Sequence, residues 1–276
     1  MSYIISFLNL ISLNLSIFKF KLMKLIVKGL LIALAFSALF QSCKPTDEQP
    51  KTGTLTVNFN ATANGQPLVL GDKYTSVKGL PYKLTLFKFY ISNLRLYSAN
   101  EPDTILDADL INFSTDAAIR HTSFSINVEP GTYSGFSFGL GLDSMQNRYD
   151  PTSFPSTSPY SASAGTHWGM FFMYRFMLIE GAIDTTDNGL ENYVLPVVIH
   201  TGFDSLYMTR DFTDHTMEIK AGQTTTLNIN FDFNKLFYSG NDTINLLTNN
   251  ITHTSDNYPL AYWVTRNFKN AFEVGN

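Results

Sequence analysis

The chain has 276 residues and a formal net charge of −4, and 14% of its residues are aromatic. A chain of this length can bury a full hydrophobic core, and single β-sandwich domains of roughly 200–250 residues are common. The acidic balance argues against a nucleic acid as partner and is compatible with a cationic ligand.

Cys43, the sole cysteine, ends a segment with the pattern of an export signal. A basic stretch from Met23 to Lys28 is followed by the apolar run Gly29–Phe40 and by Gln41-Ser42-Cys43. A basic end, an apolar core and a small residue before a cleavage point are typical of a secretory signal. A cysteine at that point predicts a bacterial lipoprotein in which Cys43 carries the lipid. The alternative is a signal peptide that is cut nearby and leaves a free thiol.

Residues 1–42 are therefore predicted to be a signal region, with Met23 as the true start. The alternative for Met1–Leu22 is a transmembrane anchor, although Asn9, Asn14 and Lys19 interrupt its apolar sequence. Removing residues 1–42 takes away four lysines and no acidic residue, which lowers the net charge from −4 to −8 and leaves 234 residues.

The expected location is outside the cytoplasm, with the lipid on Cys43 holding the protein to the bacterial outer membrane, on its periplasmic or cell-surface face. Lipidation of Cys43 leaves no thiol, so disulfides and thiolate metal sites are then excluded.

Residues 43–53 are polar and contain two prolines, which predicts a lipidated flexible tether. Residues 54–276 are predicted to form a single domain. Its first strand is indicated by Leu55, Val57 and Phe59, which alternate with polar residues. A turn is then expected at Asn64-Gly65.

The segment Tyr82–Tyr97 is long, aromatic and rich in β-formers, but its apolar residues change phase. Leu84 and Leu86 lie on one face of an extended chain, and Phe87 and Phe89 lie on the other. This slip predicts a strand that is buried on both faces, or a β-bulge.

Two segments predict β-hairpins. Residues 124–140 alternate on both sides of the turn Glu129-Pro130-Gly131, and residues 217–233 alternate around Gly222. Long loops are expected at residues 148–163 and 184–188, and at most a late turn or short helix at Thr265–Val274. The sequence thus predicts an all-β fold, an antiparallel β-sandwich with long loops and little helix.

The chain has none of the usual catalytic motifs. It lacks the GxSxG and HExxH patterns, a phosphate-binding glycine loop and a dinucleotide fingerprint. We therefore do not expect an enzyme.

Five histidines remain as candidates for metal chemistry, because neutral imidazole is the commonest metal ligand. His167 lies beside Trp168 between two glycines, with Met170 and Met173 nearby, and imidazole with thioether suits a metal such as copper. His200 ends an apolar strand and His253 lies in a polar loop, and both positions are typical of sites. His121 and His215 lie in polar stretches and are expected to be solvated. A histidine taken singly is more often a surface or hydrogen-bonded residue than a ligand.

Several motifs in order give the chain a resemblance to a known family. They are the segments Val57–Phe59, Phe89–Leu96, Val128–Tyr133, Phe138–Asp143, Met173–Gly181, His200–Gly202 and Asn267–Phe272. In this order they resemble the MbnP-like domain, across about Gly53 to Phe272.

The resemblance implies an exported β-sandwich protein that binds copper through histidines. It also implies a dihaem peroxidase-like partner that oxidises a Trp to kynurenine, a residue that helps to hold the copper. The residues that match are His200 and His253 as metal ligands and Trp168 as the modified residue, and His167 is a third metal-ligand candidate beside it.

The alternative is a structural or recognition lipoprotein without a metal. In that reading, exposed Trp and Tyr side chains bind a glycan or a partner protein, because aromatic rings are favoured anchors at interfaces.

Overall fold

The computed structural model describes residues 23, 51–98, 102–169, 173–186, 188–240 and 242–275. Residues Gln49–Asn276 form one compact unit. The predicted lipid attachment at Cys43 and nearly all of the predicted signal lie outside the described residues. Among the residues that are described, no helix is both long and apolar enough to cross a membrane.

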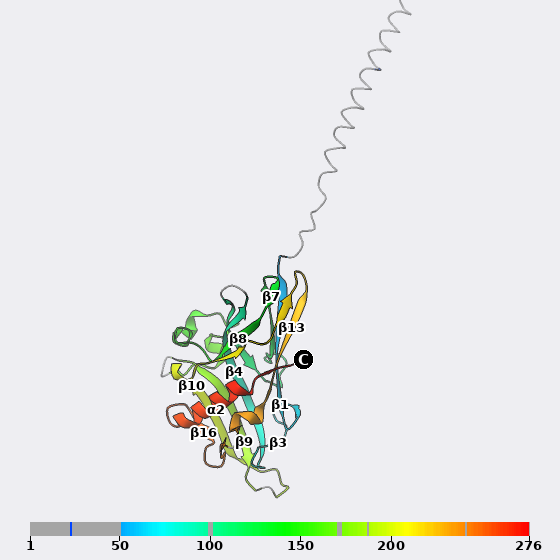
Figure 1. Ribbon diagram of the computed structural model, residues 1–276. Helices are drawn as coiled ribbons and strands as arrows, with labels where there is room; N and C mark the ends of the chain where they lie inside the picture. Colours follow the sequence, from blue (N-terminus) through cyan, green and yellow to red (C-terminus); the bar gives the residue numbers. More distant parts are fainter. Residues whose placement is uncertain are drawn as a thin grey trace, which may run out of the picture. The chain divides into compact units, whose positions relative to one another are not determined.

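Most strands of the unit Gln49–Asn276 belong to two main sheets (Figure 1). The first sheet contains, in spatial order, β17 (Glu273–Val274), β13 (Thr224–Asp232), β1 (Gly53–Ala63) and β2 (Gln66–Pro67), with β6 (Ser123–Val128) also paired with β1. The second contains β11 (Met208–Phe212), β8 (Gly135–Leu140), β4 (Pro81–Tyr97), β9 (Arg175–Asp184), β10 (Tyr193–Gly202) and β16 (Ile251–Thr252), with β3 (Tyr74–Thr75) and β5 (Asp103–Asn112) also paired with β4.

The remaining elements are short, apart from the helix α2 (Tyr258–Ala271). β7 (Gly131–Tyr133) pairs with β12 (Met217–Ile219), and β14 (Tyr238–Ser239) pairs with β15 (Asp242–Thr243). Single 3₁₀ turns form at Gln146–Arg148, Pro151–Ser153, Ala162–Ala164, Asp204–Leu206 and Phe233–Phe237. The prediction of an all-β sandwich with little helix is confirmed.

Strand β1 lies where the alternation of its residues predicts. Leu55, Val57 and Phe59 are almost fully buried. The polar residues between them face outward, and Asn58 Nδ2 donates to Asn228 Oδ1 of β13 at 3.0 Å. β1 and β13 run parallel, as do β10 and β16, whereas the other strand pairs are antiparallel.

The phase slip in β4 corresponds to both features that it predicts. The register of β4 against β9 shifts between Leu84 and Leu86, which is a bulge. Phe87 and Phe89 then face the main core, while Tyr90 is buried on the opposite face in a second apolar cluster. The middle of β4 is therefore buried on both faces.

The prediction of two hairpins is wrong. β6 pairs with β1 in the first sheet, while β8 pairs with β4 and β11 in the second. The turn at Glu129-Pro130-Gly131 therefore carries the chain from one sheet to the other. At the turn around Gly222, β12 pairs with β7 and β13 pairs with β1. The pairing of β7 with β12 therefore joins the two turns to each other.

Helix α2 is longer and begins earlier than the sequence analysis expects. The side chain of Asn257 caps it by accepting from the Leu260 N–H, and Pro259 follows in the first turn, as favoured at helix starts. Leu260, Val264 and Phe268 are buried and recur at helical spacing. Aromatic and polar residues lie between these three positions, so the helical spacing is not apparent when the segment is examined for the alternation of a strand.

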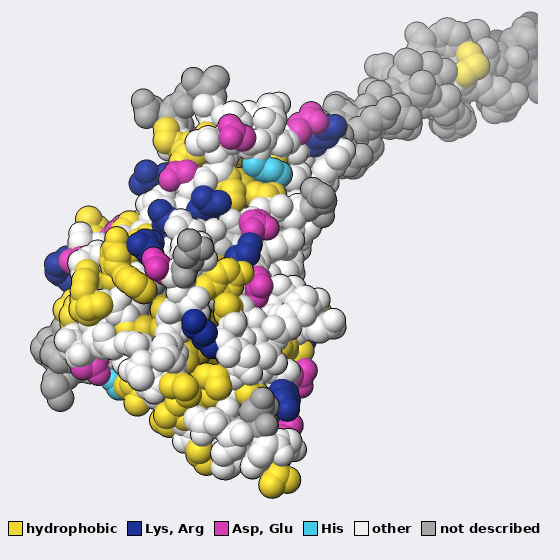
Figure 2. Space-filling model, turned by 60° about the horizontal axis from the view of Figure 1, so that its bottom comes forward, with side chains coloured by type: hydrophobic (Ala, Val, Ile, Leu, Met, Phe, Trp, Pro, Cys, Tyr) yellow, Lys and Arg dark blue, Asp and Glu magenta, His cyan; other side chains and the backbone are white. Residues whose placement is uncertain are grey.

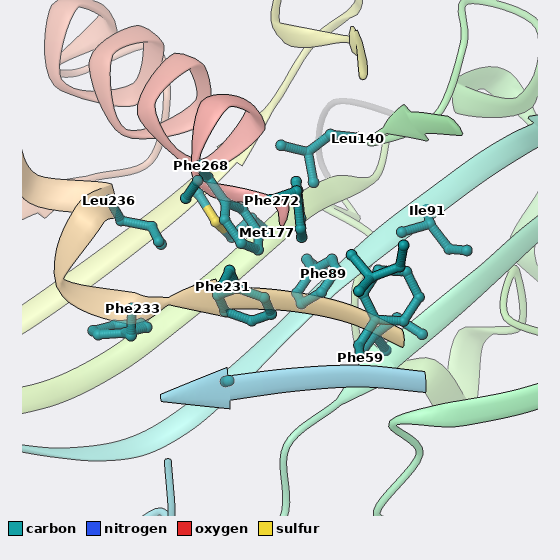
Figure 3. Packing of buried hydrophobic residues seen from close by; sticks show 14 of the residues in the cluster. Phe59, Phe89, Ile91, Leu140, Met177, Phe231, Phe233, Leu236, Phe268 and Phe272 are labelled. Atoms are coloured by element: carbon teal, nitrogen blue, oxygen red, sulfur yellow. The ribbon is translucent and has the colours of Figure 1, made fainter. Parts of the chain in front are cut away.

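The main core lies between the two sheets and beneath α2, and it is dominated by phenylalanine (Figure 3). Phe89 of β4 is fully buried, and its ring lies 5.7 Å from Phe59 of β1 and 4.8 Å from Phe268 of α2, centroid to centroid. This ring therefore joins both sheets and the helix, and such edge-to-face pairs stabilise beyond the burial of area.

Candidate metal centre

His200 lies near the end of β10 and is 5% exposed. Its cross-strand partner on β9 is Leu178, so Glu180 is a diagonal neighbour on the same face. The His200 Nε2 and Glu180 Oε1 atoms are 2.9 Å apart. His200 Nδ1 is buried and has no hydrogen-bond partner among the described residues. Burial lowers the pKa of the His200 imidazole below its usual range, which favours the neutral ring with a free lone pair.

His253 follows β16, which runs parallel to the end of β10. The hydroxyl of Thr254, a residue with a φ of 70°, donates to the carbonyl of His200 at 3.0 Å and holds the two segments together. Asp256 accepts from the His253 backbone N–H at 2.6 Å, and its other oxygen lies 3.0 Å from His253 Nδ1. This leaves the Nε2 side of the His253 ring pointing away from the carboxylate.

Trp168 lies in the segment between the polar loop and β9. Its backbone N–H donates to the Met173 carbonyl at 2.8 Å, and the guanidinium of Arg175 lies 5.7 Å from its ring centroid. The indole also packs close to Gly202, because a Cβ atom there would lie 3.0 Å from Trp168 Nε1 and 2.6 Å from the Tyr174 carbonyl. Glycine is therefore the residue that fits after His200-Thr201.

These three rings converge, although they are far apart in the sequence. The ring centroids of His200 and His253 are 5.3 Å apart, and that of Trp168 lies 6.4 Å from His200 and 6.2 Å from His253. All three pairs are edge-to-face. The sequence analysis selects these residues, and the structure brings them together.

His167 does not join them in a ring contact. Its ring packs edge-on against Tyr174 with centroids 5.0 Å apart, and the two residues form an isolated bridge. Neighbouring side chains of an extended segment point to opposite sides, so the position of Trp168 directs His167 elsewhere. Within the described ranges, no group of three or more His, Cys, Asp or Glu side chains is arranged to hold a metal ion.

The other two histidines also lie apart from this cluster. His121 Nε2 lies 2.7 Å from Asp109 Oδ2, and this bond raises the pKa of the His121 imidazole. His215 packs edge-on against Phe136. The sequence predicts both side chains to be solvated, whereas each of them contacts a specific neighbour.

Sequence reasoning misses the two carboxylates that hold the imidazoles. Glu180 lies inside the Ile179-Glu180-Gly181 motif, and Asp256 lies three residues after His253. The spacing of Asp256 is a usable signal, but the contact of Glu180 with His200 depends on the register of β9 against β10.

The distance between the His200 and His253 rings allows both imidazoles to bind one metal ion. A metal–nitrogen distance of about 2.0–2.1 Å places a bound imidazole centroid roughly 3.2 Å from the ion, so two rings on one ion have centroids at most about 6.4 Å apart. The observed 5.3 Å is within this range. Both rings also have the carboxylate partner that metal-bound histidines usually have on their other nitrogen.

The fold and the cluster together define a β-sandwich protein with two carboxylate-held imidazoles and an indole at one end of a sheet. The sequence model of the MbnP family matches residues 52–256, so the chain belongs to the MbnP family, as the resemblance predicts. This is not one of the known enzyme families.

The fold is similar to that of a solved structure, MbnP from Methylosinus trichosporium. It aligns with a TM-score of 0.51 and 15% sequence identity, over 70% of this chain and 80% of that chain. The search of the curated proteins finds no match.

Proposed function

We propose that this chain is a non-catalytic copper-binding protein in which His200 and His253 supply the ligands beside Trp168. The observation that carries the proposal is the convergence of the two imidazoles, each with a carboxylate on its other nitrogen. The residues fit a metal ion, because His200 Nδ1 is buried with no partner among the described residues. Membership of the MbnP family supports copper as the metal, and imidazole nitrogen suits it.

The hydrogen bonds indicate which nitrogen of each ring faces the metal. The Glu180 carboxylate contacts Nε2 of His200, so Nδ1 is the expected ligand atom of the His200 ring. Asp256 lies on Nδ1 of His253, so Nε2 is the expected ligand atom in that ring. In this arrangement the carboxylates hold the ring orientations and raise the basicity of the ligand atoms.

A titration of the full chain with Cu(I) and Cu(II), in detergent, tests this function together with the role of Glu180. Glu180→Gln keeps the shape of the side chain but removes its charge, so we expect copper affinity to fall about 10–100-fold. Glu218→Gln is the matched control, because Glu218 pairs with Lys220 on an exposed surface.

Two outcomes of this titration would count against the proposal. A wild-type chain that binds neither copper ion in competition with a chelator would discard the copper function. A Glu180→Gln variant that binds as tightly as the wild type would show that Glu180 does not hold His200 for the metal.

We also propose that a dihaem peroxidase-like partner oxidises Trp168 to kynurenine. Two equivalents of hydrogen peroxide convert the indole to N-formylkynurenine with release of two waters, and hydrolysis then releases formate. The new aryl amine and carbonyl form beside the two imidazoles, since the indole centroid lies 6.2 Å from that of His253. They are thus positioned as additional oxygen and nitrogen donors.

The third part of the proposal is export and lipid anchoring through Cys43 to the outer membrane. Mass spectrometry of the intact protein from its native membrane, and of its proteolytic peptides, tests this and the oxidation of Trp168 together. We expect a chain that begins at lipidated Cys43 and is about 4 Da heavier in the peptide that contains residue 168. An unmodified Trp168 peptide in copper-loaded native protein would refute the kynurenine step, and a free Cys43 thiol would refute the anchor.

A further inference from the structure

A cleft lies at the start of helix α2, and its lining includes none of His200, His253 and Trp168. It has a volume of about 300 Å³, at the lower end of the range of ligand pockets. Its lining residues come from the segment 243–249 and from the first turns of α2: Thr243, Ile244, Asn245, Asn249, Asn257, Pro259, Leu260 and Trp263.

The lining of this cleft is neutral and has two parts. Ile244, Leu260 and Pro259 supply an apolar floor, and Trp263, which is 39% exposed, adds an indole ring. The polar part consists of amides and a hydroxyl, and none of the described residues that line the cleft is charged. This lining offers a phosphate or carboxylate no charged side chain and a metal ion no carboxylate, although one cation, the guanidinium of Arg266, lies 5.9 Å from the centroid of the Trp263 ring.

Three asparagines each use only one end of the amide within the described protein. Asn245 Oδ1 accepts from the Leu247 N–H at 3.1 Å, and Asn257 Oδ1 accepts from the Leu260 N–H at 3.3 Å. Asn249 Nδ2 donates to the Thr248 hydroxyl at 3.1 Å. The amino groups of Asn245 and Asn257 and the carbonyl of Asn249 therefore remain for a ligand.

A sugar ring matches this set of groups. Its flat face of C–H bonds packs on the electron-rich face of an indole, and its hydroxyls both donate and accept hydrogen bonds, so they suit amino and carbonyl groups together. We propose that the cleft at Trp263 binds a neutral saccharide, with Trp263 as the platform and Asn245, Asn249 and Asn257 as hydrogen-bonding partners.

The surroundings of the cleft also bear on other ligands. Hydrophobic side chains are exposed in patches on the face seen in Figure 2. On α2, Tyr258 and Tyr262 are 39% and 38% exposed and stack on each other, with centroids 6.5 Å apart. Exposed aromatics of this kind also suit a membrane surface. Because the cleft is lined by amides, we favour a small polar ligand, and binding to phospholipid vesicles is one of the outcomes that the test distinguishes.

The test measures Trp fluorescence of the full chain in a detergent without a sugar headgroup. Trp168→Phe leaves Trp263 as the sole tryptophan, because the chain has two. The probes are cellohexaose, maltohexaose and chitohexaose at up to millimolar concentration. We expect a saturable emission change with at least one of them, and an affinity about tenfold lower after Asn245→Ala, which removes one hydrogen-bonding amide without touching the helix cap.

A pair of matched variants tests whether Trp263 itself binds the saccharide. Calorimetric binding should disappear in Trp263→Ala and persist in Tyr262→Ala, an equally exposed aromatic on the same helix that does not line the cleft. Circular dichroism confirms that each variant is folded. Binding that survives Trp263→Ala, no binding of any probe, or an emission change caused by phospholipid vesicles alone would each overturn the proposal.

Discussion

Replacing both His200 and His253 with alanine should abolish specific copper binding by the full chain. Loss of a carboxylate that holds a ligand imidazole costs about 10–100-fold in affinity, so the loss of either imidazole ligand should cost more than about 100-fold. The measurement is competition with a chromophoric Cu(I) chelator, with calorimetry for Cu(II).

His121→Ala is the matched control for these variants. His121 is also bonded to a carboxylate, Asp109, but it lies outside the cluster. Its loss should leave copper affinity unchanged, and thermal unfolding should show that all variants remain folded. A double variant that binds copper as tightly as the wild type would refute the assignment of both ligands.

The same titration has an expected dependence on pH. Protons compete with copper for an imidazole only below its pKa, and an unperturbed histidine has a pKa of about 6.5. Burial lowers the pKa of His200, so its neutral form persists as the pH falls through that value. The contribution of His200 to copper affinity should therefore be nearly constant from pH 8 to about 6.5 and fall only at lower pH, where His200 is protonated.

Phe89→Ala should be among the most destabilising single substitutions in the core. The ring is fully buried and touches six other phenylalanines in both sheets and in α2, so its loss leaves a cavity that the strands cannot close. We expect a loss of about 3–5 kcal/mol in the free energy of unfolding. Urea unfolding followed by circular dichroism measures this change.

Val194→Ala serves as the control for the core variant. Val194 lies in β10 and is 62% exposed, so its truncation should change the free energy of unfolding by less than about 0.5 kcal/mol. A loss of less than 1 kcal/mol for Phe89→Ala would contradict a core in which this ring joins the two sheets.

Local patterns in the sequence predict most individual strands but not how they pair. The alternation in β1 and the phase slip in β4 are both visible, because burial of one or two faces acts directly on residue type. The turns at Glu129-Pro130-Gly131 and Gly222 have hairpin chemistry, yet each carries the chain between sheets. A turn fixes the reversal of direction, whereas the partner strand depends on distant residues.

The candidate site shows the same division. His200 and His253 are selected by family resemblance and by their positions at a strand end and in a loop. Their proximity depends on the parallel pairing of β10 with β16, which no local pattern encodes. His167 is adjacent to Trp168 in sequence, and for that reason its side chain points away from the cluster.

The identity of the copper ligands is tested most directly by X-ray absorption spectroscopy of the Cu(I)-loaded full chain. The account predicts imidazole nitrogen scattering from two rings in the wild type and from one ring in His253→Ala. A wild-type spectrum without imidazole scattering, or one dominated by sulfur, would contradict a metal centre built on His200 and His253.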